Sequence, residues 1–74
     1  MPKKPKLAVD KVIAMVCSYR DHFVGQQNEY IMPGLNSYIY EEISEKTGHE
    51  MSAKAVYLFV DRHQEKIISA LGIR

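Results

Sequence analysis

The chain has 74 residues, a formal net charge of +1 at neutral pH and one cysteine, Cys17. A chain of this length forms a single domain, near the lower limit at which a hydrophobic core is stable without disulfides or metals. One cysteine excludes an internal disulfide, and 46% hydrophobic with 26% charged residues is typical of a folding domain. The sequence shows neither a signal peptide nor an apolar run of membrane-spanning length, so we expect a reducing, intracellular location.

The charges are distributed unevenly along the chain. Residues 1–24 carry five Lys or Arg against two acidic residues, residues 25–50 carry one against five, and residues 51–74 carry four against two. The chain is therefore basic, acidic and basic in turn. This pattern predicts one surface suited to a nucleic acid and another suited to a basic protein partner.

Residues 1–8 form a predicted basic arm in front of a single domain at residues 9–74. The arm begins MPKKPK, and its two prolines keep it out of a helix. Lys3, Lys4 and Lys6 have the spacing of a minimal nuclear-import cluster, and the same cations suit contact with phosphates. The other interpretation is a solvated, disordered terminus.

The first predicted helix begins at Val9 or Asp10 and ends at Phe23. Its expected buried stripe recurs at three- and four-residue steps and consists of Val9, Val12, Ile13, Val16, Tyr19 and Phe23. Cys17 lies off this stripe and is expected to be a small apolar filler. In the loop that follows, at residues 24–34, we expect at least one of three apolar residues to fold back onto the core: Tyr30, Ile31 and Met32.

The second predicted helix starts after a cap at Asn36 or Ser37 and ends near Lys46. Its narrow apolar stripe consists of Leu35, Ile39 and Ile43, with Tyr38 or Tyr40 beside them. Acidic residues crowd the opposite side: Glu41, Glu42 and Glu45. The connector at residues 48–51 is short, so the second and third helices are expected to meet steeply, as in a helix-turn-helix.

The third predicted helix is the longest and runs from a Ser52 cap to Leu71, about five turns, where Gly72 ends it. Its apolar stripe consists of Val56, Phe59, Val60, His63, Ile67 and Leu71. The sequence therefore predicts an all-α three-helix bundle with helix-turn-helix character and a long C-terminal helix.

The predicted helices carry a pattern of residues that resembles the Myb/SANT-like trihelical group, and within it the MADF-type domain. The apolar pair Phe23-Val24 ends the first helix, and Tyr30 lies in a polar loop. The second helix reads SYIYEEI at residues 37–43, and Gly48 and Ser52 lead into a third helix that contains Val56, Phe59 and Val60. The resemblance covers residues 10–66.

This resemblance implies a nuclear DNA- or chromatin-associated module that acts in transcription or chromatin regulation. The family packs tryptophans in its core and this chain has none. Three other aromatic residues would take their place: Tyr38, Tyr40 and Phe59.

On the DNA hypothesis, the outward face of the third helix enters the major groove. Lys54 and Arg62 suit phosphate contacts or a guanine edge, and Tyr57 suits a thymine methyl group. The expected DNA-binding residues are Lys3, Lys4, Lys6, Lys54, Tyr57, Arg62 and Lys66, whose cations would make binding sensitive to salt. Asp61 and Glu65 share the outward face and repel phosphate, so the same charges also fit a solvated helix surface.

The alternative hypothesis is a protein-interaction or homodimerisation domain that binds no nucleic acid. Tyr57 and Leu58 lie beside the core stripe, and together with Met51, Ala55 and Ile68 they widen the apolar surface of the third helix. A partner helix or a second copy would dock there. The acidic second helix, with Glu41, Glu42 and Glu45, would receive a basic tail such as that of a histone.

No enzymatic or metal-binding pattern is present in the sequence. The soft ligands are Cys17, His22, His49 and His63, and none of them pairs at a metal-ligand spacing. No nucleophile has a base at a recognisable spacing, and there is no glycine-rich phosphate loop. We therefore expect no catalytic residues, no metal, no cofactor and no small-molecule substrate.

Overall fold

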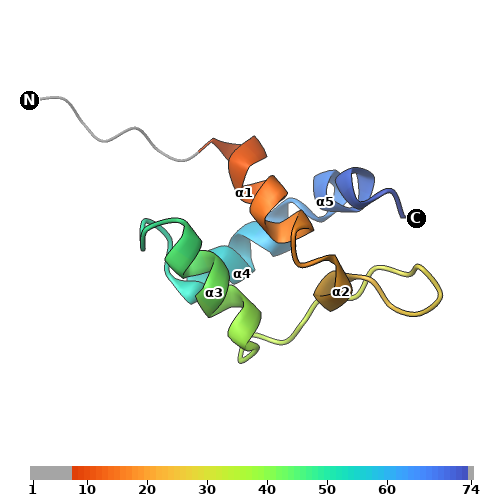
Figure 1. Cartoon of the computed structure of the whole chain (residues 1–74), viewed down its shortest axis with the longest axis horizontal. Helices are drawn as coiled ribbons and strands as arrows, with labels where there is room; N and C mark the ends of the chain where they lie inside the picture. The colour runs from red at the N-terminus through yellow and green to blue at the C-terminus, as the bar shows by residue number, and fades with distance from the viewer. Residues whose placement is uncertain (1–7, 74) are drawn as a thin grey trace, which may run out of the picture.

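The computed structural model describes residues 8–73, and within that range it is an all-α bundle without strands. The helices, shown in Figure 1, are α1 (Val9–Cys17), α2 (Arg20–Phe23), α3 (Tyr38–Lys46), α4 (Ala53–Arg62) and α5 (Gln64–Leu71). The predicted all-α class is confirmed. Two of the three expected helices are each divided in two, so the expected long C-terminal helix is not continuous. No described helix has both the length and the apolar character needed to cross a membrane.

The first expected helix is interrupted at residues 18–19. Ser18 turns its hydroxyl back to donate to the carbonyl of Met15 at 2.6 Å, and Tyr19 leaves the helical region with φ −107° and ψ 39°. A serine hydroxyl that bonds to the preceding turn competes with helix continuation. α2 is therefore a separate single turn that ends at the buried Phe23.

The predicted third helix bends at His63, which has φ −110° and ψ 26°. α4 packs mainly on α3, whereas α5 packs mainly on α1. A straight helix would carry Ile67 and Leu71 beyond the surface that α3 offers, and the bend turns both side chains into the core instead. Burying each contributes about 1.5–3 kcal/mol, which offsets the backbone bonds lost at the bend.

The turn between α3 and α4 is built by short polar side chains. Gly48 and His49 both have positive φ, at 69° and 63°, which reverses the chain within a few residues. The buried Ser44 donates to the carbonyl of Met51, and Thr47 donates to the carbonyl of Ser44 at 2.6 Å. These bonds tie the end of α3 to the turn that leads into α4.

Both predicted ends of the C-terminal helical segment are confirmed. The Ser52 hydroxyl accepts a bond from the amide of Ala55 at 3.1 Å, which caps α4. Gly72 follows α5 in the left-handed conformation, with φ 72°. On α3, Ser37 occupies the cap position, without a side-chain cap bond.

The core consists of side chains from α1, α2, α3, α4 and α5. Its fully buried members are Val12, Val16, Phe23, Ile39, Tyr40, Ile43, Val56, Val60 and Ile67. Val9 and Leu35 were expected to be buried, and this is wrong, because both side chains are exposed. Val9 is the first residue of α1, and Leu35 precedes α3. The sequence did not decide whether Tyr38 or Tyr40 joins the apolar stripe of the second predicted helix. In the structure Tyr40 is buried and Tyr38 is exposed.

The loop after α2 folds back onto the core, as expected. Tyr30 stacks on Phe23 with ring centroids 6.5 Å apart, and Met32 packs against the core while Ile31 stays exposed. An isolated antiparallel bridge joins Val24 to Tyr30 at the base of the loop.

Candidate functional site

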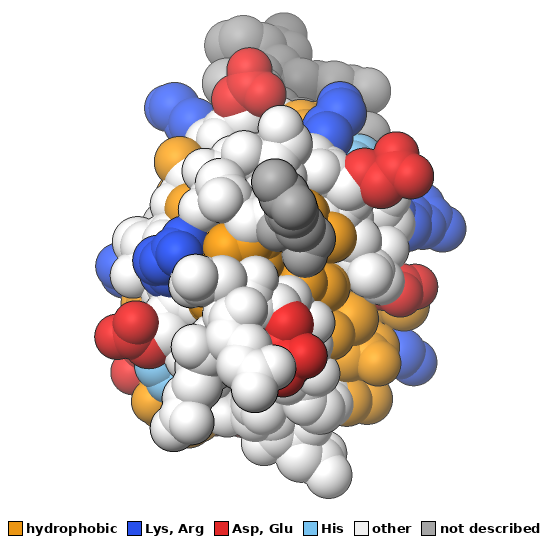
Figure 2. All heavy atoms as spheres, turned by 90° about the vertical axis from the view of Figure 1, so that its right-hand side faces the viewer, with side chains coloured by type: hydrophobic (Ala, Val, Ile, Leu, Met, Phe, Trp, Pro, Cys, Tyr) orange, Lys and Arg blue, Asp and Glu red, His pale blue; other side chains and the backbone are white. Residues whose placement is uncertain are grey.

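The outer face of α4 carries an apolar hollow of about 310 Å³. It is lined by Met51, Ala55, Leu58, Phe59, Arg62 and His63. Leu58 is 45% exposed, and the other apolar members are half-buried. We call this set of six residues the α4 hollow. Hydrophobic side chains also gather along the right-hand edge of the view in Figure 2, bordered by acidic and basic groups.

A second hollow, of about 410 Å³, lies at the bend between α4 and α5 and is lined by residues 61–66. It shares Arg62 and His63 with the α4 hollow, so the two adjoin. The His63 ring leans on Phe59 with centroids 4.4 Å apart. Gln64 bridges the bend, because its amide donates to the carboxylate of Asp61 at 2.9 Å.

The expected DNA-binding residues are not brought together on one helix face. Lys54, Arg62 and Lys66 are all exposed, but Lys66 lies on α5 beyond the bend. Tyr57 was expected on the outward face, and this is wrong. Its ring meets Tyr40 edge-to-face at 5.3 Å, half-buried beside α3, because the ring reaches back to the core. Lys3, Lys4 and Lys6 lie outside the described residues.

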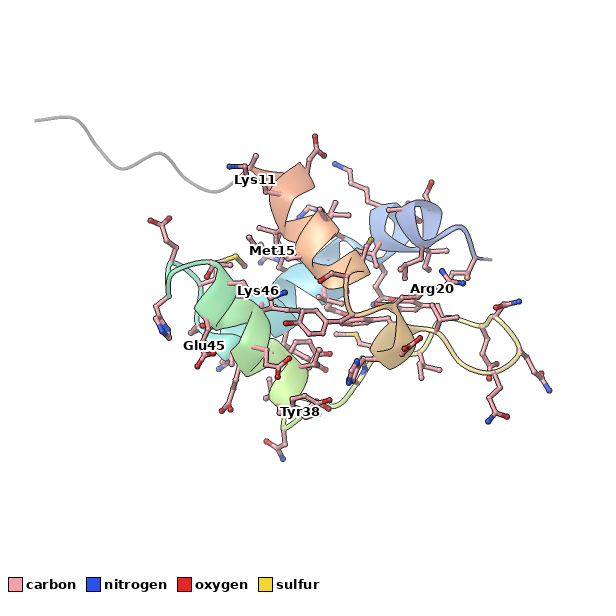
Figure 3. All side chains as sticks on the ribbon, viewed as in Figure 1. Lys11, Met15, Arg20, Tyr38, Glu45 and Lys46 are labelled. Atoms are coloured by element: carbon pink, nitrogen blue, oxygen red, sulfur yellow. The ribbon has the colours of Figure 1, made fainter. Side chains whose placement is uncertain are left out.

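Of the residues expected to bind a protein partner, Leu58 is exposed in the α4 hollow, whereas Tyr57 is not part of it. The acidic residues of α3 are all exposed: Glu41, Glu42 and Glu45. Beside them the ammonium of Lys46 lies 4.8 Å from the centre of the Tyr19 ring. Figure 3 shows Glu45 and Lys46 next to each other on α3. An intramolecular cation therefore already occupies the Tyr19 ring face beside this acidic surface.

The cysteine and histidines are dispersed through the described fold. Burial raises the pKa of the Cys17 thiol, which lowers its reactivity. His22 shares a 2.6 Å hydrogen bond with the hydroxyl of Tyr38, and His49 lies in the turn between α3 and α4. Among residues 8–73, no three His, Cys, Asp or Glu side chains are grouped as metal ligands.

Two features of the fold gave no sequence signal. Arg20, on α2, reaches across to donate to the carbonyl of Leu71 at the end of α5, and Figure 3 shows it on that side. The aromatic rings form two sets of contacts: Tyr19 and Tyr38 with His22 and Lys46, and Tyr30, Tyr40 and Tyr57 with Phe23. The Arg20–Leu71 and Phe23–Tyr40 contacts join residues that are distant in sequence, so no local spacing marks them.

Comparisons with protein-family models, with curated proteins and with solved structures found no match to this chain. The resemblance to Myb/SANT and MADF domains therefore remains a prediction from the residues.

Proposed function

We propose that this domain is a protein-interaction module that binds a partner on the outer face of α4. The observation that carries the proposal is the α4 hollow. α4, the helix that follows the turn after α3, presents an apolar depression on its outer face. Partner helices commonly dock into such grooves through apolar anchors.

The half-exposed Leu58 is the group whose burial would contribute most to binding. Burying a whole leucine side chain contributes about 1.5–3 kcal/mol, so burying the exposed half of Leu58 contributes roughly half of that, about three- to tenfold in affinity. Leu35 offers a matched comparison, because it is 47% exposed and lies outside the α4 hollow.

The test places a photoactivatable crosslinking residue at Leu58, with Leu35 as the control position, in cells that make the protein. The partner crosslinked from Leu58 is identified and purified, and its affinity for the uncrosslinked domain is measured. Leu58→Glu should weaken that affinity at least about tenfold, and Leu35→Glu should change it by less than about twofold. Equal losses of affinity in Leu58→Glu and Leu35→Glu, or the absence of a crosslinked product specific to the Leu58 position, would overturn the proposal.

The second candidate function is a nuclear DNA- or chromatin-binding module in transcription or chromatin regulation. The exposure of Lys54, Arg62 and Lys66 favours it, together with the cations expected in the basic arm. Against it, the apolar centre of α4 offers a DNA groove little to bind, and Asp61 repels phosphate.

Fluorescence anisotropy of a random DNA duplex separates this candidate from the first. If DNA is the ligand, micromolar binding at about 50 mM salt should weaken about a hundredfold at about 200 mM. Lys54→Glu combined with Lys66→Glu should abolish it, and Leu58→Gln should leave it intact. Absence of binding at about 100 μM protein in the lower salt would exclude the DNA candidate.

A further inference from the structure

The residues of the α4 hollow follow the spacing of a helix–helix seam. Ala55, Leu58 and Arg62 lie on α4 at successive steps of three and four residues, and Met51 stands just before the helix at the same hollow. This alternation is the pattern by which one helix packs along another. Ala55 is small enough for a partner backbone to approach closely, and Leu58 supplies the apolar contact.

Arg62 is the one formally charged residue among the six that line the α4 hollow. It also lines the adjoining hollow at the bend, so it lies where the two meet. Within residues 8–73 its guanidinium makes no hydrogen bond or ion pair, whereas the neighbouring Asp61 already accepts from Gln64. A guanidinium offers only donors in a planar fork, and a carboxylate matches that fork.

We infer that the partner segment is an amphipathic helix with an apolar anchor over Leu58 and, about one turn away, a carboxylate against Arg62. This inference rests on the proposed function and adds the chemical class of the partner. The apolar contact supplies affinity. The Arg62 contact fixes the register, because a charged seam position accepts only a matching partner residue.

A second copy of this chain fits the surface poorly. In an antiparallel two-fold pair centred on Leu58, positions four residues to either side oppose each other, which places Arg62 against the other copy's Lys54. In a parallel two-fold pair, Arg62 meets the other copy's Arg62. Both arrangements bring like charges together, and an acidic helix brings opposite charges together instead.

The test uses two designed helical peptides of about 16 residues with leucines at the seam positions. One carries Glu where the helix faces Arg62, and the other carries Lys there, with all other residues the same and uncharged. Each is titrated into the whole 74-residue protein while backbone amide shifts are recorded. Variants Arg62→Glu, Leu58→Glu and Leu35→Glu are titrated in parallel, after circular dichroism has shown that they fold.

The Glu peptide should bind at least about fivefold more tightly than the Lys peptide and shift the amides of residues 51–63. Arg62→Glu should reverse this preference, Leu58→Glu should abolish the binding of both peptides, and Leu35→Glu should change neither.

Equal binding of the two peptides that Leu58→Glu abolishes would overturn the acidic partner and leave the proposed function standing. No binding of either peptide at about 1 mM would overturn this inference, and the crosslinking at Leu58 then decides the proposed function separately. A dimer at about 100 μM in sedimentation that Leu58→Glu dissociates would identify a second copy as the occupant and overturn it as well. Displacement of the Glu peptide by a DNA duplex would also overturn this inference.

Discussion

Tyr40 connects the core to the loop after α2, and removing its hydroxyl tests this connection. Its side chain is fully buried, and its hydroxyl donates to the carbonyl of Pro33 at 2.7 Å. The ring also meets Phe23 and Tyr57 edge-to-face, at 6.4 and 5.3 Å. Tyr40→Phe keeps the rings in contact and deletes only the hydrogen bond.

The loss of stability expected for Tyr40→Phe has two sources: the hydrogen bond that is removed, and the Pro33 carbonyl that no longer has this donor. The first contributes about 0.5–1.5 kcal/mol, and an unsatisfied buried carbonyl costs about 1–3 kcal/mol. Pro33 is only half-buried, so water reaches part of the carbonyl and the lower end applies. We expect Tyr40→Phe to lower the free energy of unfolding by about 1–2 kcal/mol. In a domain of this size each kcal/mol lowers Tm by about 4–8 °C.

Urea unfolding followed by circular dichroism measures this change directly. The control is Tyr38→Phe, because the Tyr38 ring is 57% exposed and its bond to His22 is open to water. The control should lose less than about 0.5 kcal/mol. A Tyr40→Phe variant as stable as the control would show that the hydroxyl does not hold the loop to the core.

Two further predictions concern the helix ends. Ser52→Ala should lower the free energy of unfolding by about 1 kcal/mol, whereas Ser37→Ala should cost less because Ser37 makes no side-chain cap bond; urea titration of both variants checks this. Arg20→Leu removes a cation from the C-terminal end of α5, so hydrogen exchange at the amides of Gly72 and Ile73 should accelerate by about two- to fivefold, and Lys11→Leu, far from that end, should leave it unchanged.

The sequence was sufficient for features whose cause is local. The Ser52 cap and the Gly72 stop depend on one residue each and were predicted correctly. The buried positions of Ile39 and Ile43 follow from helical periodicity alone. The acidic residues of α3 were placed outward for the same reason.

The breaks in the helices could not be predicted because no Gly or Pro marks them. His63 leaves the helical region so that α5 can pack on α1, and this depends on a helix fifty residues earlier in the chain. The bend also determines which side chains line the candidate site. A continuous helix would place Lys66 one turn after Arg62 in a single basic row. With the bend, Arg62 ends α4 and Lys66 lies on α5, so only Arg62 lines the α4 hollow. Tyr57 was misplaced because helical angle alone does not show how far an aromatic ring reaches.

Alkaline pH offers an independent test of the packed tyrosines. Burial, with the nearby Tyr30 and Tyr57, raises the pKa of Tyr40, and burial with the Asp61 carboxylate raises the pKa of Tyr30. In the unfolded chain both hydroxyls ionise near pH 10. The folded state therefore keeps protons that the unfolded state has released once the pH rises above about 10.

The sign of the effect follows from this difference in bound protons. The stability that the neutral hydroxyls contribute is complete below about pH 10 and is lost as the pH rises towards their folded pKa values. Each such group lowers the free energy of unfolding by up to about 1.4 kcal/mol per pH unit. Between about pH 10 and 11.5, Tyr40→Phe should flatten the fall in stability by about that amount, although the variant is the less stable protein at neutral pH. Equal slopes for the variant and the original chain would mean that Tyr40 ionises as readily in the folded protein as in the unfolded one, and that its hydroxyl is not sealed in the core.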